Sequence, residues 1–329
     1  MKTLEEAELC FPQLRNSSCR KTMRPYSVSM ILYIILSCIS LLTVILNLLV
    51  IISISHFKQL HTPTNLLLLS LAVSDCFVGL LVVFQILLLD GCWYFGELTC
   101  VLYYIFDYVI TSASIGTMVL ISIDRFVAIC YPLHYLSKAT QQRTKICVSL
   151  CWMCAALCHC LILKDNLKQP GRYSSCAGEC VVVLHHVAGS VDLFLSFVGP
   201  VTVIVVLYVR VFVVAVSQAR AMRSDVTAFT LQGSVNATVK KSELKAATTL
   251  GVVIVVFLIC LCPYFCATLT GQDVLLNSSS MAFVICLFYF NSLLNPLIYG
   301  LFYPWFRKSI KLIITFQILR SGSCDAQIM

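Results

Sequence analysis

Long runs without charged side chains limit what this chain can fold into. Four runs contain no Asp, Glu, Lys or Arg at all: 25–57, 146–163, 246–272 and 274–306. Three more are each broken by a single aspartate: 59–89, 98–123 and 180–209. A membrane-spanning helix needs about 20 mostly apolar residues, and a backbone in lipid must satisfy its own hydrogen bonds. The seven runs therefore predict an all-α membrane protein, a bundle of seven transmembrane helices.

The positions of the runs set the expected limits of the helices. The predicted spans are 26–55, 64–90, 97–131, 145–163, 186–218, 243–270 and 279–302. Pro200, Pro263 and Pro296 lie inside spans and should kink them. A last segment, 304–317, alternates aromatic and aliphatic with basic side chains, a pattern typical of a helix lying on membrane lipid. The expected organisation is an extracellular N-terminus (1–25), the bundle (26–302), and an amphipathic helix with a cytoplasmic tail (303–329).

The distribution of Lys and Arg predicts the orientation of the bundle. These residues are more frequent in the loops opposite the N-terminus, as is typical of cytoplasmic loops. The N-terminus should therefore be extracellular in a multi-pass plasma-membrane protein, where the Asn16-Ser17-Ser18 sequon can be glycosylated. The net charge of +8 is mainly this topology signal. The sequence has no basic stripe interleaved with aromatic residues, so it does not predict binding to nucleic acid.

Three aspartates lie within the apolar runs, namely Asp75, Asp107 and Asp192. No Lys or Arg lies in the middle of any run to neutralise them. An ionisable residue in a membrane is costly, and by default indicates a functional site. If these carboxylates are charged, the positive partner must come from outside the protein, as a metal cation or an ammonium ligand.

The depth of two of these carboxylates follows from helix geometry. Arg125 lies five turns beyond Asp107 on the same stripe of the third span, roughly 27 Å along a helix. Asp107 should therefore lie toward the outer side and Arg125 at the cytoplasmic edge. Asp192 lies about two turns outward of Pro200, at a comparable depth. Both carboxylates can then face one outward-opening cavity.

The chain has 19 cysteines, most of them inside spans, where a free thiol behaves as a small apolar group. Disulfides are plausible on the oxidising outer side. A zinc site is the competing interpretation of Cys176 and Cys180, but no second pair with metal spacing accompanies them. The outer cysteines are Cys10, Cys19, Cys92, Cys100, Cys176 and Cys180.

Motifs in several spans together resemble those of the rhodopsin-like G-protein-coupled receptors. Segments 56–65, 91–97 and 291–306 further resemble the trace amine-associated receptors, and the chain is similar to the diamine-sensing members of fish. The family motifs are matched, in order along the chain, by Asn47, Asp75, Asp124-Arg125-Phe126, Trp152, Pro200, Tyr208, Phe257, Cys260, Pro263 and Asn295-Pro296-Leu297-Ile298-Tyr299.

The resemblance implies that Asp107 is the counter-ion of an amine ligand. It places Tyr289 across from Asp107, with Tyr264 and Phe265 walling the site, and aromatic faces attract an ammonium group. Thr111 lies one turn from Asp107 and is included in the expected site. The alternative is a structural aspartate, hydrogen-bonded to Tyr289 or Thr111.

An acid at Asp192 distinguishes this chain from most biogenic-amine receptors, which carry serine or threonine there. Two like charges in one cavity disfavour each other's ionised form, and a ligand with two ammonium groups relieves both. The resemblance therefore favours a short aliphatic diamine held between Asp107 and Asp192. In the alternative, Asp192 pairs with His159, His185 or His186, or stays protonated. A monoamine receptor that uses Asp107 alone is the second hypothesis.

Asp75 resembles the family's ligand for an allosteric sodium ion, and no other cofactor is expected. The implied oxygen partners are Ser114, Asn291 and Asn295, and oxygen ligands suit a hard cation. The alternative is a buried, hydrogen-bonded carboxyl group.

At the inner face, Arg125 with Asp124 resembles the family's activation switch, and Glu243 on the sixth span is its implied partner. Tyr208 and Tyr299 match further switch positions. Opening of such a pair admits a heterotrimeric G protein, and the subfamily suggests a stimulatory G protein and olfaction. Leu261 stands where the family usually has tryptophan, so a weakly signalling amine binder is a further alternative.

The resemblance also implies disulfide pairings on the outer side. Cys100 should bond Cys180, and Cys176 should bond the N-terminal segment through Cys19, with Cys10 as the second choice. Cys92 has no assigned partner, and a free thiol is the alternative for Cys10 or Cys92.

Two other classes of membrane protein are disfavoured by the sequence. A transporter would need discontinuous helices and a repeat of two halves. An enzyme would need a nucleophile–base pair or a metal cluster, and the intramembrane His159 stands alone. The prediction is therefore a receptor and not an enzyme.

Overall fold

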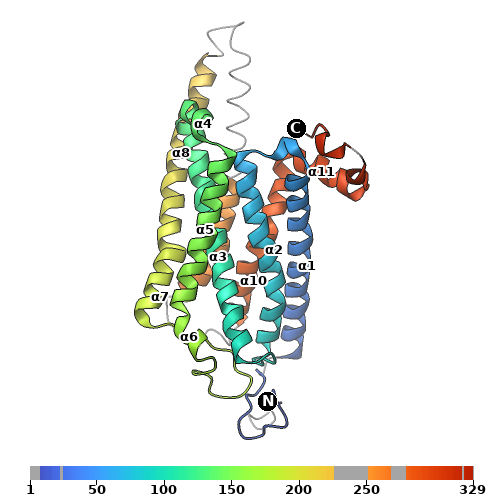
Figure 1. The fold of residues 1–329 in the computed structure, drawn as a ribbon, viewed down its shortest axis with the longest axis vertical. Helices are drawn as coiled ribbons and strands as arrows, with labels where there is room; N and C mark the ends of the chain where they lie inside the picture. Colours follow the sequence, from blue (N-terminus) through green and yellow to red (C-terminus); the bar gives the residue numbers. More distant parts are fainter. Residues whose placement is uncertain (1–7, 23–24, 226–250, 268–278, 321, 329) are drawn as a thin grey trace.

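The structure, a computed structural model, describes residues 8–22, 25–225, 251–267, 279–320 and 322–328. In this part of the chain, six helical spans are long and apolar enough to cross a membrane, and Gly251–Ala267 is a shorter apolar helix. The long helices run side by side as a bundle (Figure 1). They comprise α1 (Tyr26–His56), α2 (Pro63–Leu89), α3 (Glu97–Cys130), α5 (Gln141–Ile162), α7 (His186–Leu193) continued by α8 (Gly199–Asp225), and α10 (Ser279–Phe302). The described architecture agrees with the predicted seven-helix bundle.

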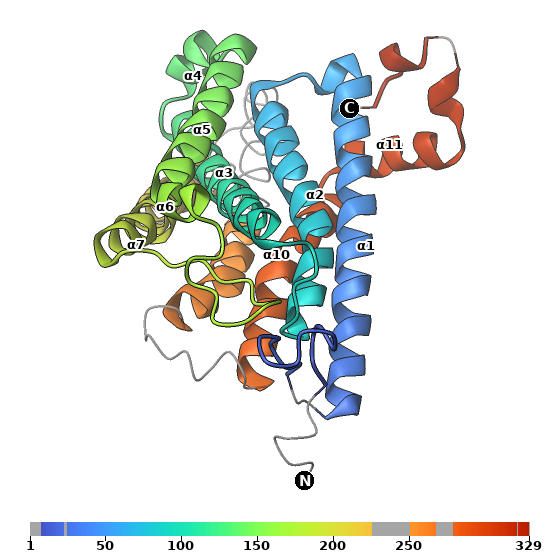
Figure 2. The ribbon, with the colours of Figure 1, turned by 60° about the horizontal axis from the view of Figure 1, so that its bottom comes forward.

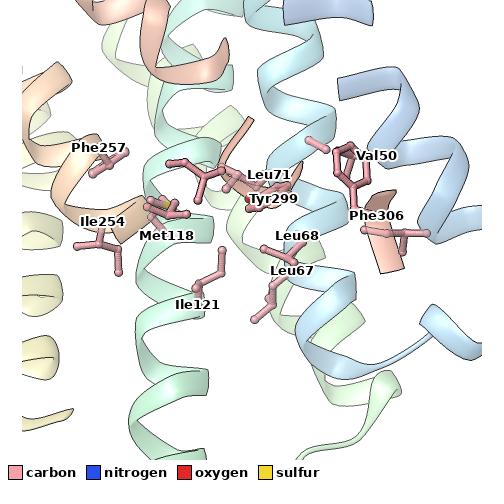
Figure 3. Packing of buried hydrophobic residues seen from close by; sticks show 14 of the residues in the cluster. Val50, Leu67, Leu68, Leu71, Met118, Ile121, Ile254, Phe257, Tyr299 and Phe306 are labelled. Carbon is pink, nitrogen blue, oxygen red and sulfur yellow. The ribbon is translucent and has the colours of Figure 1, made fainter. Parts of the chain in front are cut away.

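Helix α3 is the centre of the bundle. It packs against α2, α5 and α8, while α1 packs against α2 and α10. Figure 3 shows side chains from several helices meeting in one apolar cluster, including Leu68 and Leu71 of α2 and Met118 of α3. Tyr299 of α10 and Phe257 of the helix 251–267 are buried in the same cluster. Lipid chains are as apolar as these side chains, so close packing rather than removal from water holds together the helices that carry the site.

The π-helical turn Phe194–Val198 joins α7 to α8 just before Pro200. Proline has no N–H group to donate, and its ring clashes with the carbonyl group four residues earlier, which here belongs to Ser196. The wider π turn accommodates both effects. It also sets the orientation of Asp192 and Ser196, which hydrogen-bond to each other. The sequence predicted a kink at Pro200 but not this turn.

Helix limits differ from the prediction where polar residues decide them. α5 begins at Gln141 rather than 145, because Thr140 caps it by accepting a hydrogen bond from the Arg143 N–H group. The predicted start at 145 was the charged residue that borders the apolar run, but a helix can begin with a polar turn outside such a run. Two short helices were not predicted, α4 (Pro132–Lys138) and α6 (Lys164–Lys168).

The predicted surface helix is α11 (Pro304–Ile314), which lies across the end of α1 (Figures 1 and 2). It buries Trp305 and Phe306. It ends before the predicted residue 317, because Phe316 adopts a left-handed conformation with φ 55°. The following tail returns to the short helix Lys58–Leu60, where Lys58 and Asp325 form an exposed ion pair of 3.0 Å. The hydrogen bond from Lys58 lowers the pKa of Asp325.

Three disulfides tie together the end of the bundle at which the N-terminal segment lies. They are Cys100–Cys180, Cys19–Cys176 and Cys10–Cys92. The expectation that left Cys92 without a partner, with a free thiol at Cys10 or Cys92 as the alternative, is wrong. The backbone N–H of Cys10 donates to the Cys19 carbonyl at 2.9 Å, so the two disulfides of the N-terminal segment lie close together.

The zinc alternative for Cys176 and Cys180 is also wrong in this structure. Each of these sulfur atoms is joined to a different cysteine. A third group, Glu179, lies near Cys19 and Cys176. Its carboxylate accepts hydrogen bonds from the backbone and hydroxyl of Ser175 instead. Asn16 is exposed in the same N-terminal segment, as its predicted glycosylation requires.

Candidate functional site

Asp107 projects from α3 and has no charged or hydrogen-bonded partner among the described residues. Its surroundings are phenolic: Tyr103, Tyr104, Tyr108, Tyr264 and Tyr289 all lie within electrostatic range. A carboxylate among aromatic rings can receive an ammonium group, because the ring faces attract the same cation. Asp107 thus presents an uncompensated negative charge if it is ionised.

If Asp107 were only a structural aspartate, it was expected to form a hydrogen bond with a neighbour such as Tyr289. Tyr289 of α10 does not form this bond. Its hydroxyl donates to the side-chain carbonyl of Gln85 at 3.4 Å, and the Tyr103 hydroxyl donates to the same oxygen at 3.0 Å. Gln85 of α2 therefore ties α3 and α10 together beside Asp107. Gln85 was not predicted, although it stands out as the polar residue of the apolar stretch 76–89.

Tyr264 and Phe265 line a cavity of about 450 Å³ together with Tyr108, Asp192, His185 and His186, and we call it the outer cavity after the side on which the sequence predicted a ligand site. Phe265 also stacks on Phe197 of the π turn, with ring centroids 4.3 Å apart. A ligand in this cavity would contact aromatic rings from two helices. Asp107 is not among the lining residues of this cavity, although Tyr108 and Tyr264 lie within electrostatic range of both Asp107 and Asp192.

Asp192 differs from Asp107 because it has partners inside the protein. Its Oδ1 atom lies 3.0 Å from Nε2 of His159 on α5 and accepts a hydrogen bond of 3.1 Å from the Ser196 hydroxyl. Of the three histidines considered as its partners, His159 is the one that makes this contact. His185 instead lies 3.6 Å from Asp165. The sequence alone could not choose among them, because His159 and Asp192 lie on different helices.

Asp75 is fully buried on α2. Its Oδ2 atom accepts a hydrogen bond of 2.8 Å from Asn295 on α10. Three nearby predicted ligand oxygens have no hydrogen-bond partner among the described residues: Oδ1 of Asp75, Oδ1 of Asn291 and Oδ1 of Asn295. Buried oxygen atoms without donors fit a hard cation, which prefers carboxylate and amide oxygen ligands.

A small cavity lies deep in the bundle beside these residues. Its volume of about 20 Å³ is lined by Ser114 and Thr111 of α3 and by Asn291 of α10. Leu261, at the position where the family usually has tryptophan, lines it from the helix 251–267. The cavity exceeds the roughly 10–15 Å³ that one water molecule needs. Thr111 therefore lines this deep cavity rather than the outer one.

At the other end of α3, Arg125 is buried and paired with its neighbour Asp124. Arg125 also donates to the Thr64 hydroxyl at 2.6 Å, and Thr64 donates to Asp124 at 2.9 Å. The Tyr135 hydroxyl of α4 donates to Asp124 at 3.0 Å. Thr64 and Tyr135 were not predicted, because only the fold brings the start of α2 and helix α4 to this end of α3.

The other switch residues are only partly described. Glu243, the implied partner of Arg125, lies outside the described residues. The hydroxyl groups of Tyr208 and Tyr299 are buried and have no hydrogen-bond partner in the described part of the chain. Both hydroxyls can therefore form new hydrogen bonds if the helices rearrange.

Comparison with known proteins identifies the family. Residues 46–299 match the family described as 7 transmembrane receptor (rhodopsin family). Similar proteins include Trace amine-associated receptor 13c of Danio rerio (38% identity, 98% of this chain and 96% of that protein aligned) and Trace amine-associated receptor 6 of Homo sapiens (37%, 97% and 95%). Trace amine-associated receptor 4 of Mus musculus is 35% identical, with 98% and 96% aligned. The chain is thus a multi-pass receptor and not an enzyme, and it belongs to the trace amine-associated receptors of the rhodopsin family.

Proposed function

We propose that this receptor resides in the plasma membrane with its N-terminus outside, binds amines, and signals through a heterotrimeric G protein of the stimulatory type. The observation that carries the proposal is the carboxylate of Asp107, which has no counter-charge among the described residues and lies among tyrosine rings. An ammonium ligand supplies both the missing charge and the cation that the rings attract. The names of the similar proteins point to the same class of ligand.

The preferred agonist in this proposal is a short aliphatic diamine. One ammonium group pairs with Asp107 and the other with Asp192, which lines the outer cavity of about 450 Å³. Tyr108 and Tyr264 lie near both carboxylates and would contact the methylene groups that join the two ammonium groups of the ligand. A monoamine receptor is the second candidate, and the contact of Asp192 with His159 favours it, because that carboxylate already has a partner.

Replacing Asp192 by Asn should separate these two candidates. If Asp192 receives the second ammonium group, D192N lowers diamine potency by about ten- to a hundredfold and leaves monoamine potency within about threefold, since one partly solvated charge contact is worth roughly 1.5–3 kcal/mol. The measurement is amine-dependent cyclic AMP over a panel of mono- and diamines, with amine uptake measured in parallel. D165N is the matched control, because Asp165 is a carboxylate outside the outer cavity. An equal loss for both kinds of amine contradicts the diamine assignment.

We also propose a sodium ion near Asp75, supported by the unpartnered oxygens of Asp75, Asn291 and Asn295 and by Ser114 in the deep cavity. An ion that binds one receptor state better than another shifts the population between them. Replacing external sodium by a large organic cation should therefore change agonist potency severalfold in the wild type. The change should disappear in D75N and persist in D192N. Equal sodium sensitivity of D75N and the wild type would remove the proposed ion.

The proposed coupling surface is the end of α3 that carries Asp124 and Arg125. Arg125 is held by Asp124 and Thr64, and agonist would favour a state in which this network opens toward the G protein. Leu261 lies between the outer site and this end and packs against Phe257 in the apolar cluster. Weak signalling by an amine-occupied receptor is the alternative that Leu261 leaves open.

A further inference from the structure

The contacts of His159 with Asp192 and with its own helix determine where the hydrogens of the imidazole ring lie. His159 is 4% exposed and Asp192 13% exposed. The Nδ1 atom of His159 lies 2.8 Å from the Ala155 carbonyl oxygen, which can only accept a hydrogen bond, so Nδ1 carries a hydrogen. The Nε2 atom faces the carboxylate oxygen Oδ1 at 3.0 Å. A hydrogen must lie between these two atoms as well, because two lone pairs at that distance repel.

This second hydrogen can be bonded to either atom. Bonded to Nε2, it makes an imidazolium beside a carboxylate; bonded to Oδ1, it makes a neutral imidazole beside a carboxylic acid. In both cases the pair has no net charge. The Ser196 hydroxyl donates to the same Oδ1 atom, and the His159 ring stacks on Tyr108 with centroids 5.6 Å apart. Of the pair, Asp192 lines the outer cavity, and both residues line a second hollow.

We propose that His159 is a specificity-determining residue that exchanges one proton for the second ammonium group of a diamine. The inference rests on the proposed function. An ammonium group near Asp192 places two cations on one carboxylate if His159 is charged, and faces a neutral acid if Asp192 is protonated. Either arrangement is relieved when the pair loses one proton to the buffer base of the extracellular fluid. The products are a neutral His159 and an ionised Asp192, with the ammonium group donating to the Asp192 carboxylate in place of the hydrogen that was lost, so charge and protons balance.

Each helix that packs against the His159–Asp192 pair contributes further titratable groups. α3 contributes Asp107 and Tyr108, and the helix 251–267 contributes Tyr264. His185 and His186 line the outer cavity, and His185 faces Asp165 rather than Asp192. α5 contributes the thiols of Cys151, Cys154 and Cys158, which line a hollow with His159 and Asp192. Direct contact with Asp192 distinguishes His159 from the other two histidines.

Proton release gives diamine binding a pH dependence that monoamine binding lacks. Protons and the second ammonium compete for the same pair, so diamine affinity rises as external pH rises, by up to about tenfold per pH unit while the pair holds its proton. A monoamine that binds at Asp107 alone leaves the His159–Asp192 pair with its proton. Its affinity therefore does not depend on pH through this pair. The ratio of diamine to monoamine potency should therefore increase with pH.

The test measures potencies of one diamine and one monoamine at external pH of about 6, 7 and 8, in cells with matched surface levels. Linkage predicts that the potency ratio rises toward the limit of about tenfold per pH unit in the wild type. It should be flat in H159Q, whose amide can donate to Asp192 but holds no exchangeable charge. H185Q is the matched control: His185 lines the same cavity but faces Asp165 rather than Asp192, so this variant should keep the slope whatever its absolute potencies. H159N replaces H159Q if the latter does not reach the surface.

The outcomes separate this inference from the proposed function. A flat ratio in the wild type, with diamine potency still dependent on Asp192, overturns proton exchange and leaves the diamine site standing. A slope that survives in H159Q and H159N, or disappears in H185Q, also overturns the role of His159. Absence of any diamine response at all three pH values refutes the diamine site and, with it, the inference.

Discussion

Replacement of Asp107 by Asn is expected to lower the potency of every amine agonist by about a hundred- to a thousandfold. At about 4 Å and an effective dielectric constant near 20, an ammonium–carboxylate pair is worth on the order of 4 kcal/mol before desolvation. Each 1.4 kcal/mol is a factor of about ten in affinity. Asp107 has no charged partner among the described residues, so its loss removes the ligand's contact without leaving a protein cation unpaired.

The measurement is the concentration–response curve for amine-dependent cyclic AMP, normalised to receptor at the cell surface. E97Q is the matched control, because Glu97 lies on the same helix and is exposed at its outer end. This variant should respond like the wild type. Undiminished responses to amines in D107N, at normal surface level, would contradict both the amine site and the proposals that rest on it.

Replacement of Cys100 by Ser should remove most folded receptor from the cell surface. The bond Cys100–Cys180 joins the outer end of α3 to a loop residue 80 positions away. Cys100 is buried with Trp93 and Tyr103 in a cluster of its own. Loss of a native disulfide typically costs about 2–5 kcal/mol, a large part of a net stability of about 5–15 kcal/mol. We therefore expect at least a tenfold fall in surface receptor.

Surface labelling of intact cells and thermal inactivation of solubilised receptor measure this effect. C158S is the control, since Cys158 is a free thiol within α5 and should behave nearly as the wild type. C92S removes the bond to Cys10 and should have a smaller effect, because that bond fastens only the N-terminal segment. Normal surface level and heat resistance of C100S would show that this bond is not required for the fold.

The helices could be predicted because lipid imposes a length and forbids an unpaired backbone. α3 begins at Glu97 as expected and ends at Cys130, one residue from the predicted limit. The same rule fails outside the apolar runs, where α4 and α6 form from polar sequence. There the hydrogen bonds of helix caps and contacts such as Tyr135 with Asp124 decide the conformation.

The chemistry of the site was only partly contained in the sequence. That Asp107 and Asp192 lie in apolar runs is visible from composition, and their depths follow from the rise of a helix. Their different environments are not visible in the sequence. Asp192 has partners in His159 and Ser196, whereas Asp107 has none among the described residues. The cysteines show the same limit: their positions were evident, but the bond between Cys10 and Cys92 was not.

The sequence by itself determined the membrane class, the helices and the receptor family, since these depend on local composition and on ordered motifs along one chain. The tertiary structure decided which side chains meet across helices: His159 with Asp192, Thr64 with Arg125, and Gln85 with Tyr103. Such contacts depend on how each helix is rotated and shifted against its neighbours. That geometry results from packing of the whole bundle, including the π turn before Pro200, and no single segment encodes it.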